Sequence, residues 1–223
     1  MIEIKNLNKI YLKGKKNMVH ALNNINLKID DRETVAIIGE SGAGKSTLLH
    51  IMSCIDNFDG EYYLDNIDIN KLSESKKSKL RSSKIGIVLQ DFALIDDFTV
   101  FENVMTPLYF NKKIKDKKGS VMRALKKTGI ASLKAKKVSQ LSGGQKQRVA
   151  ISRALVTNPE YIFADEPTGS LDSKTSEEIV KMLFDLNRNG ITIVIVTHNL
   201  EIANQCHHII EIKDGNIIKD ICS

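Results

Sequence analysis

Short apolar runs along the chain predict the strands of the fold. Strand-like segments lie at residues 2–5, 25–29, Thr34–Ile38, 85–89, 161–164, Thr192–Val196 and 209–212. Two of them, Thr34–Ile38 and Thr192–Val196, are continuously apolar and do not alternate with polar residues. Strands buried on both faces have this composition. The pattern therefore predicts central strands of a parallel sheet that helices cover on both sides.

Turn signals and helical periodicity predict the other parts of the fold. Asp65-Asn66 and Asp214-Gly215 separate short strand-like runs, as turns do in hairpins of an antiparallel sheet. Between about residues 91 and 159 the strand pattern gives way to helical patterns, as at 121–127 and 145–156. We therefore expect one α/β domain over residues 1–223, with a mixed, mainly parallel sheet, an antiparallel β portion and a helical subdomain inserted at about 91–159.

A glycine-rich segment after the first central strand predicts a phosphate site. It satisfies the pattern G-x-x-x-x-G-K-[ST] and precedes an apolar helix, as a P-loop requires. Its residues are Gly39, Glu40, Ser41, Gly42, Ala43, Gly44, Lys45, Ser46 and Thr47. Backbone amides and the helix N-terminus would bind the phosphates of ATP. We expect Lys45 to bridge the β- and γ-phosphates and the Ser46 hydroxyl to coordinate Mg²⁺.

Two carboxylates end the apolar run at residues 161–164, which matches a Walker B strand. A buried parallel strand would place Asp165 at the carboxyl edge of the sheet beside the P-loop, where it can bind the Mg²⁺ shell. Glu166 would then polarise the attacking water, because a base neutralised by direct metal ligation cannot do so. The fold class predicted is thus a P-loop nucleoside triphosphatase core of the RecA-like kind.

Composition and cysteine content restrict the setting. The 223 residues are 42% hydrophobic and 27% charged, as in ordinary globular proteins. No run approaches the roughly 18 apolar residues of a membrane span, and the first residues lack a signal-peptide pattern. We expect a protein of the cytosol unless a partner holds it at a membrane. The three cysteines are too scattered for a disulfide framework, and for Cys206-His207-His208 we expect a structural role, with no metal ion.

The net charge of +6 leaves nucleic acid, an acidic membrane surface or a merely lysine-rich sequence as explanations. Much of the excess lies in two runs, at residues 71–84 and 112–118. Neither run has the interleaved aromatic residues of a single-strand binding groove. A solvated face explains both runs better, and we expect no nucleic-acid partner.

One string distinguishes among the many classes of P-loop protein. Leu141, Ser142, Gly143, Gly144 and Gln145 precede an amphipathic helix and closely resemble the signature motif of ABC ATPases. Ser142 and the glycine amides at a helix N-terminus would form a second anion-binding cradle. The resemblance implies that this cradle reaches the γ-phosphate from the opposite subunit. It therefore implies a head-to-tail homodimer that encloses two ATP molecules.

Other segments resemble further motifs of the same family, in the expected order, over essentially the whole chain. Gln90 matches the Q-loop glutamine, which contacts Mg²⁺ or the attacking water and couples to the transporter. Asp172 belongs to a D-loop, His198 matches the switch histidine at the γ-phosphate, and Tyr11 matches the aromatic residue that stacks on adenine. A packing role for Tyr11 is an equal alternative. The chain departs from its relatives at residues 206–208, where many carry an Asp-Arg pair.

Residues 86–104, 107–108 and 166–172 look like the branch that contains the macrolide exporter, lipoprotein-release and bacitracin-resistance ATPases. Phe92-Ala-Leu-Ile is similar to ATPases of bacteriocin exporters of the lactococcin 972 type. The resemblance implies a separate membrane permease, contacted through about residues 90–111, which holds the protein at the cytoplasmic face of the membrane. It also implies outward transport of antimicrobial peptides, antibiotics or lipoproteins.

Two other functions fit the sequence less well than a transporter subunit does. A soluble ABC ATPase that acts on DNA or ribosomes would need long coiled-coil arms or a second ATPase domain, and the sequence has neither. A P-loop kinase would leave the Leu141-Ser-Gly-Gly-Gln segment and the Asp165-Glu166 pair without a role. The complete set of motifs therefore favours the ATP-binding and ATP-hydrolysing subunit of an ABC transporter.

Overall fold

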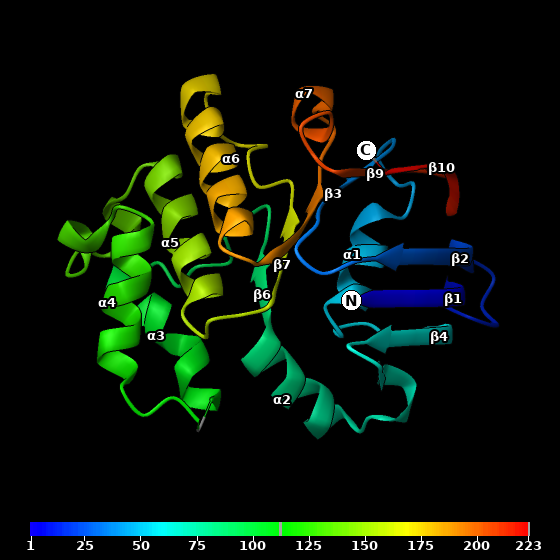
Figure 1. Cartoon of the computed structure of the whole chain (residues 1–223), viewed down its shortest axis with the longest axis horizontal. Coiled ribbons are helices and arrows are strands. Elements are labelled where there is room, and N and C mark those ends of the chain that lie inside the picture. Colours follow the sequence, from blue (N-terminus) through cyan, green and yellow to red (C-terminus); the bar gives the residue numbers. More distant parts are fainter. Residues whose placement is uncertain (112, 223) are drawn as a thin grey trace.

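The computed structural model describes residues 1–111 and 113–222, which form two sheets with helices around them (Figure 1). The larger sheet has the strand order β10-β9-β3-β8-β7-β6. Its strands are β3 (Thr34–Ile38), β6 (Ile85–Val88), β7 (Tyr161–Asp165), β8 (Thr192–Val196), β9 (His208–Lys213) and β10 (Asn216–Cys222). Every neighbouring pair is parallel except β9 and β10. The predicted mixed, mainly parallel sheet is therefore confirmed.

The smaller sheet is antiparallel, with the order β2-β1-β4-β5. Its strands are β1 (Ile2–Tyr11), β2 (Val19–Ile29), β4 (Asp59–Leu64) and β5 (Ile67–Asp68). Asp65 and Asn66 form the β4–β5 turn with positive φ angles of 51° and 61°, as a type I′ hairpin turn requires. Asp214 and Gly215 do the same between β9 and β10, with φ angles of 48° and 75°. Both predicted hairpins are therefore confirmed.

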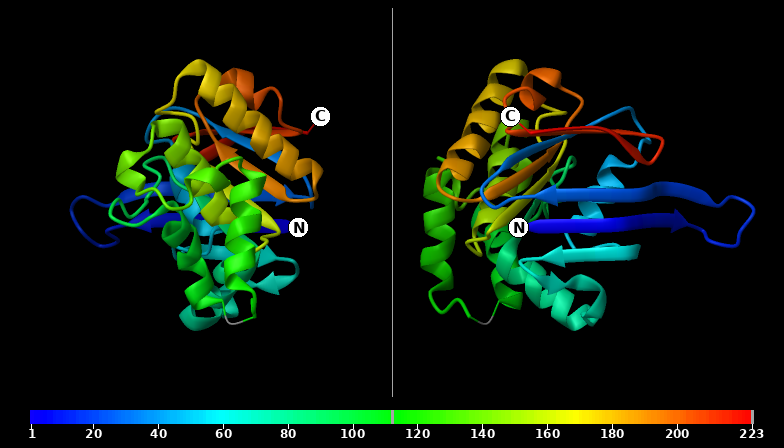
Figure 2. Two further views of the ribbon diagram at one scale, coloured as in Figure 1. Left: turned by 90° about the vertical axis from the view of Figure 1, so that its left-hand side faces the viewer. Right: turned by 45° about the vertical axis from the view of Figure 1, so that its right-hand side comes forward.

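Strands β1 and β2 are longer than the predicted segments and project together from the rest of the molecule (Figure 2). Their pairing is interrupted by register shifts, and Asn6 and Asn24 lie at irregular positions with φ angles of 49° and 47°. Asparagine tolerates this left-handed conformation better than most residues. These polar bulge positions break the apolar alternation, so the sequence pattern predicted only the regular strand ends.

Helices lie on both sides of the large sheet (Figures 1 and 2). They are α1 (Lys45–Met52), α2 (Glu74–Lys84), α3 (Val100–Phe110), α4 (Lys117–Lys127), α5 (Gly143–Leu155), α6 (Ser173–Arg188) and α7 (Leu200–Ala203). Short 3-10 turns lie at Ile69–Lys71, Ala131–Leu133 and Val138–Gln140. Helices α3, α4 and α5 all fall between β6 and β7, which is where the helical pattern was expected.

The central strands separate two hydrophobic cores. Tyr161 and Phe163 of β7 pack in one core with α1 and the antiparallel sheet. Ile162 and Ala164 of the same strand face the other core, which α3, α4, α5 and α6 line. Alternate side chains of a strand point to opposite faces, so a strand between two cores must be apolar at every position. This arrangement explains the unbroken apolar runs in the sequence.

The lysine-rich run at residues 71–84 was expected to be a solvated face, and this expectation is wrong in part. The run includes the whole of α2, where Lys77 is buried and donates to Asn57 Oδ1 at 3.2 Å. Lys84 donates to Asp65 Oδ2 at 2.5 Å and to Glu160 Oε2 at 2.8 Å. Long lysine side chains can pack their aliphatic stems while the ammonium finds an oxygen. Part of the positive charge thus fixes α2 to its neighbours.

Candidate functional site

The P-loop joins β3 to α1 in a conformation that depends on glycine. Gly39 and Gly44 have φ angles of 144° and 108°. A Cβ on Gly44 would stand 2.5 Å from Ala21 O, which no side chain tolerates. The amide of Gly215 in the last hairpin donates to Ala43 O at 3.0 Å, so a segment distant in sequence supports the loop. Sequence and packing together fix a glycine-rich loop before the N-terminus of α1, an arrangement that can bind an anion through backbone amides.

Lys45 begins α1 and folds back over the loop. Its ammonium donates to Gly39 O at 2.8 Å and to Glu40 O at 2.7 Å. An ammonium has three N–H donors. These two bonds hold the positive charge at the mouth of the loop, where a phosphate oxygen can accept a further hydrogen bond.

The carboxyl end of β7 brings two acidic residues to the P-loop. Asp165 is buried, and Ser46 donates to its Oδ1 at 3.2 Å. Glu166 follows with a φ angle of 44°, a conformation that is costly for a residue other than glycine and is often found at functional sites. Its Oε2 is buried without a hydrogen bond among the described residues, and it lies 3.0 Å from His198 Nδ1. Glu166 and His198 therefore lie side by side at the carboxyl edge of the sheet.

The parallel sheet brings three of the predicted residues and the P-loop to one edge. Gln90 follows β6, Asp165 ends β7, His198 follows β8, and the P-loop follows β3. Carboxyl ends of parallel strands meet at the same edge of a sheet, which is the usual location of ligand sites in such folds. Gln90 also lies beside Gly169, with its Nε2 4.0 Å from the position of a Cβ there.

Tyr11 lies beside this edge, at the end of β1. Its hydroxyl donates to Asp56 Oδ2 at 2.7 Å, and the Lys9 ammonium lies 4.7 Å from the centre of its ring. Burial and the bond to Asp56 raise the pKa of Tyr11, while a hydrogen bond with Thr47 lowers it. Contact with Thr47 places the ring next to the P-loop, as adenine stacking requires.

The signature segment forms the N-terminus of α5, on the other side of the central sheet from α1 (Figure 1). Ser142 caps the helix by accepting from Gln145 N at 3.4 Å, and the Gln145 side chain accepts from Ser142 N at 3.2 Å. This reciprocal capping box fixes where the helix begins. Ser142 and Gly143 are exposed, so the segment faces outward and not into its own subunit.

The D-loop lies against the signature segment. A Cβ on Gly144 would stand 2.4 Å from Thr175 Cγ2, and one on Gly143 would stand 3.4 Å from Leu171 Cδ2. Asp172 caps α6 and accepts from Thr175 Oγ1 at 2.6 Å and from Thr175 N at 2.9 Å. The bonds from Thr175 lower the pKa of Asp172. Gln90, Glu166 and His198 therefore share an edge with the P-loop, whereas Asp172 lies with the signature segment.

Sequence reasoning missed two residues of α5 that hold the site together. Arg153 donates to Phe92 O at 2.8 Å and also to the carbonyl of Ala93, just after Gln90. Buried Gln147 donates to Pro167 O at 2.7 Å, next to Glu166. Both side chains bind backbone carbonyls, which any residue supplies, so no motif in the sequence indicates these contacts.

The fold and the site define a nucleotide-binding ATPase of the P-loop class, with a second glycine-containing segment exposed at the N-terminus of α5. Within this class the family can be identified, because a family model described as "ABC transporter" matches residues 22–169 of the chain. The chain belongs to this family, as its motifs predicted. It is the ATP-binding subunit of an ABC transporter and an ATP hydrolase.

Individual relatives match nearly the whole chain. The uncharacterised ABC transporter ATP-binding protein MJ0796 of Methanocaldococcus jannaschii is 45% identical over 227 residues, 99% of this chain and 96% of its own. The macrolide export ATP-binding/permease protein MacB of Mannheimia succiniciproducens is 45% identical over 222 residues, but the chain spans only 34% of that protein. These relatives confirm the predicted resemblance to the macrolide-exporter branch.

Solved structures confirm the fold class. A dimeric structure of MJ0796 in a post-hydrolysis state bound to ADP and Pi has a TM-score of 0.91 and 42% identity. The match covers 100% of this chain and 98% of that one. Among the described residues, no helix is both long enough and apolar enough to cross a membrane.

Proposed function

We propose that this subunit acts as a head-to-tail homodimer that closes around two ATP molecules. Lys45 of one copy and Ser142 of the second copy would hold the same γ-phosphate. One observation carries the proposal: the two anion-binding segments are both accessible but belong to opposite sides of the central sheet. A single chain cannot apply both to one nucleotide. The solved dimer of the relative MJ0796 supports this arrangement.

The residues at the sheet edge suit Mg²⁺, which prefers oxygen ligands. The Ser46 hydroxyl, the Asp165 carboxylate and the Gln90 amide oxygen would hold the ion, and the first two already lie 3.2 Å apart. Bound Mg²⁺ would neutralise charge that develops on the phosphates during hydrolysis. Glu166 would orient the attacking water through its carboxylate, and His198, 3.0 Å away, would position Glu166 and contact the γ-phosphate.

The remaining site residues would bind the nucleotide and connect the two copies. The amides of residues 39–47 would bind the phosphates, and Tyr11 would stack on adenine. The Gly143 and Gly144 amides and the side-chain amide of Gln145 would complete the cradle offered to the second copy. Asp172, which already fixes the start of α6 beside this cradle, would transmit contacts across the dimer.

A further part of the proposal concerns the membrane partner. Large apolar side chains are exposed along the segment that follows Gln90, among them Ile95, Phe98, Tyr109 and Phe110, the last with 78% of its surface exposed. Phe110 also lines a hollow of about 330 Å³ between α2, β6 and α3. Such a surface fits an apolar cytoplasmic segment of a permease. The relative MacB carries a permease in the same chain, which supports this partner.

The permease would hold the subunit at the cytoplasmic face of the membrane and determine what is transported. The resemblance to macrolide-export proteins supports outward transport of an antimicrobial peptide, antibiotic or lipoprotein-like substrate. Purification of the tagged subunit from its native membrane should co-purify the permease. Phe110→Ser should reduce this recovery, whereas Leu200→Ser on α7, which is also exposed, should not. Crosslinks to the permease that map outside residues 90–111 would contradict the docking site.

The dimer can be tested with the hydrolysis-deficient variant Glu166→Gln. It should bind ATP, hydrolyse it very slowly and elute as a dimer in MgATP. Adding Ser142→Ala should leave ATP binding intact but shift elution back to the monomer, whereas Lys45→Ala should lose ATP binding itself. Glu166→Gln that binds ATP yet stays monomeric at saturation would contradict closure around the nucleotide.

A further inference from the structure

The open end of the last hairpin brings together three side chains that are good metal ligands. Strands β9 and β10 pair Cys222 directly with His208 and Asp220 with Ile210. Opposed residues of antiparallel strands share a face, and so do residues i and i+2 of one strand. The backbone register therefore turns His208, Asp220 and Cys222 to one face. Their ligand atoms all lie within 4.8 Å of one another.

His208 has the environment of a metal-binding imidazole. Its side chain is buried, yet its Nε2 lies 2.5 Å from Asp220 Oδ1 on the exposed side. Its Nδ1 is buried without a hydrogen bond among the described residues and lies 3.6 Å from Glu33 Oε2. Histidines that bind metals commonly direct the second ring nitrogen to a carboxylate, which fixes the ring and its tautomer. Glu33 is the carboxylate on that side of the ring, just beyond hydrogen-bond distance.

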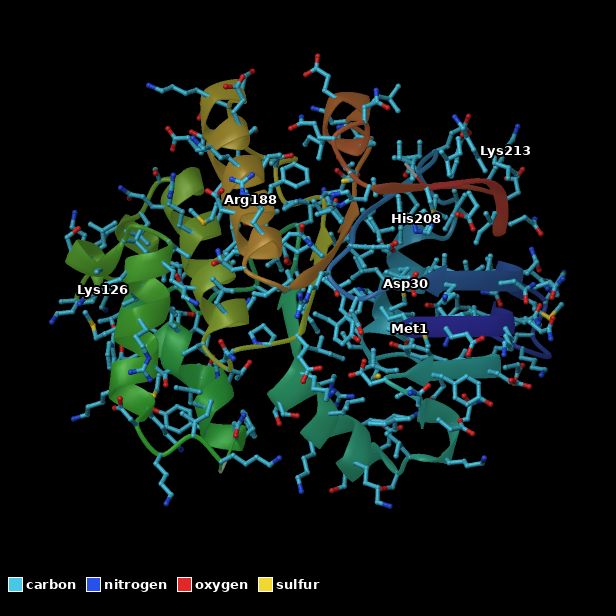
Figure 3. The ribbon with its side chains drawn as sticks, viewed as in Figure 1. Met1, Asp30, Lys126, Arg188, His208 and Lys213 are labelled. Carbon is cyan, nitrogen blue, oxygen red and sulfur yellow. The ribbon has the colours of Figure 1, made fainter. Side chains whose placement is uncertain are left out.

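The charges around the hairpin end favour a cation. The carboxylates of Glu33, Asp220 and Asp30 all interact electrostatically with the Cys222 thiol. Lys28 Nζ offsets Asp30 at 3.2 Å. Figure 3 shows His208 and Asp30 on the same side of the molecule, where β9 and β10 form the edge of the sheet. A divalent ion would offset the charges that Glu33 and Asp220 bring to this small region.

We propose that His208 Nε2, the Asp220 carboxylate and Cys222 Sγ bind one divalent transition-metal ion, with Zn²⁺ the best match. A set of nitrogen, oxygen and sulfur ligands suits Zn²⁺ and does not suit Mg²⁺ or Ca²⁺, which prefer oxygen. Binding would release the thiol proton to solvent, because the thiolate is the ligand. Three protein ligands leave one tetrahedral position for water. The ion would join the edge strand β10 to β9, far in sequence from the P-loop.

From the sequence alone we expected no metal ion at residues 206–208, because that expectation rested only on residues that are neighbours along the chain. Cys206 and His207 precede His208, but Cys206 is buried in a small core with Ala36 and Ala203. His207 instead contacts Thr34, whose Oγ1 lies 2.7 Å from its Nδ1. The candidate ligands come from the opposite strand, and only the hairpin register brings them to His208.

Titration of the full-length chain without nucleotide tests the proposal. Co²⁺ should bind in a ratio of one ion per chain and give a thiolate-to-cobalt charge-transfer band with tetrahedral d–d bands. Zn²⁺ should displace it in competition with a chromophoric chelator. Cys222→Ser should abolish the charge-transfer band, and Asp220→Asn should weaken Zn²⁺ binding. Glu33→Gln should weaken Zn²⁺ binding by roughly 10- to 100-fold, as loss of a carboxylate behind a histidine ligand does.

Matched variants separate this site from others. Cys206→Ser removes another thiol and Asp214→Asn another carboxylate of the same hairpin, and both should leave Zn²⁺ affinity unchanged. Asp165→Asn should also retain it, which excludes ion binding at the nucleotide site. Asp220 and Cys222 are exposed, so their variants should keep the wild-type circular dichroism spectrum. Wild type that binds no stoichiometric Zn²⁺, or Cys222→Ser with wild-type affinity, would overturn the proposal and leave an ordinary His208–Asp220 ion pair.

Discussion

The two glycines of the signature segment should prove necessary for different reasons. A Cβ on Gly144 would stand 2.4 Å from Thr175 Cγ2, within the same subunit. Thr175 cannot rotate away without losing the bond from its Oγ1 to Asp172 Oδ2, at 2.6 Å. Gly143 is exposed, and a Cβ there meets only Leu171 Cδ2, at 3.4 Å. Internal packing therefore explains why residue 144 is glycine. In the proposed dimer, residue 143 would have to be glycine because a second copy approaches it.

The magnitudes follow from these contacts. Gly144→Ala should gain about 0.5 to 1 kcal/mol from removing a glycine inside a helix. It should lose about 1 to 3 kcal/mol because the added methyl group overpacks against Thr175. The net result is a destabilisation of between about 0 and 2.5 kcal/mol, and the midpoints of the two ranges give about 1 kcal/mol. Thr175→Ser keeps the hydroxyl but removes Cγ2, so Gly144→Ala in that background should cost little or increase the free energy of unfolding.

Urea unfolding of the four proteins of this double-mutant cycle measures the coupling. We expect roughly 1 to 3 kcal/mol of interaction between positions 144 and 175, and restored ATPase activity in the double variant. Gly143→Ala should change the free energy of unfolding by less than about 1 kcal/mol but lose ATPase activity. Effects at positions 144 and 175 that add within roughly 0.5 kcal/mol would refute the packing argument, since independent sites behave in that way.

Three further predictions concern the rest of the molecule. Burial alone would raise the pKa of Asp65, but hydrogen bonds led by the one from Lys84 lower it. The stability that ionised Asp65 contributes to the fold is therefore lost as the pH falls below 3.8. Asp65→Asn should flatten the acid dependence of the free energy of unfolding, and an unchanged slope would contradict this expectation. Burial raises the pKa of the Cys54 thiol to about 11, so a thiol reagent at neutral pH should label exposed Cys222 first, as mass spectrometry can check. Phe163→Ala should cost about 3 to 5 kcal/mol in thermal or urea unfolding, and Phe163→Leu clearly less.

The sequence was sufficient to predict the central sheet, because strands buried on both faces are apolar at nearly every position. Thr34–Ile38 and Thr192–Val196 are buried at every position, and both were predicted from their unbroken apolar character. The P-loop and Asp165 were predictable for a similar reason, since their positions follow directly from the strands before them. Sequence patterns therefore predicted those features whose positions depend only on nearby residues in the chain.

What the sequence missed depends on contacts between distant segments. Asn6 and Asn24 form bulges that hide the true length of β1 and β2. Arg153 and Gln147 bind carbonyls 61 and 20 residues away, and the identity of an acceptor residue does not reveal its carbonyl. The cluster around His208 depends on a hairpin register that no single strand discloses. Each missed feature required knowledge of which segments are neighbours in space.

Helix α5 gives a physical route by which the membrane partner and the nucleotide can influence each other. Ser142 lies at its N-terminus. Gln147 binds the carbonyl of Pro167, next to Glu166, the proposed catalytic carboxylate. Arg153 near the end of the helix binds the segment that begins the proposed docking surface. The helix has 13 residues and so extends about 20 Å. Its only glycines are the first two residues, so the rest offers no hinge. A force on the proposed docking surface would therefore move Ser142 with it, which would let a permease open or close the proposed nucleotide sites without touching them.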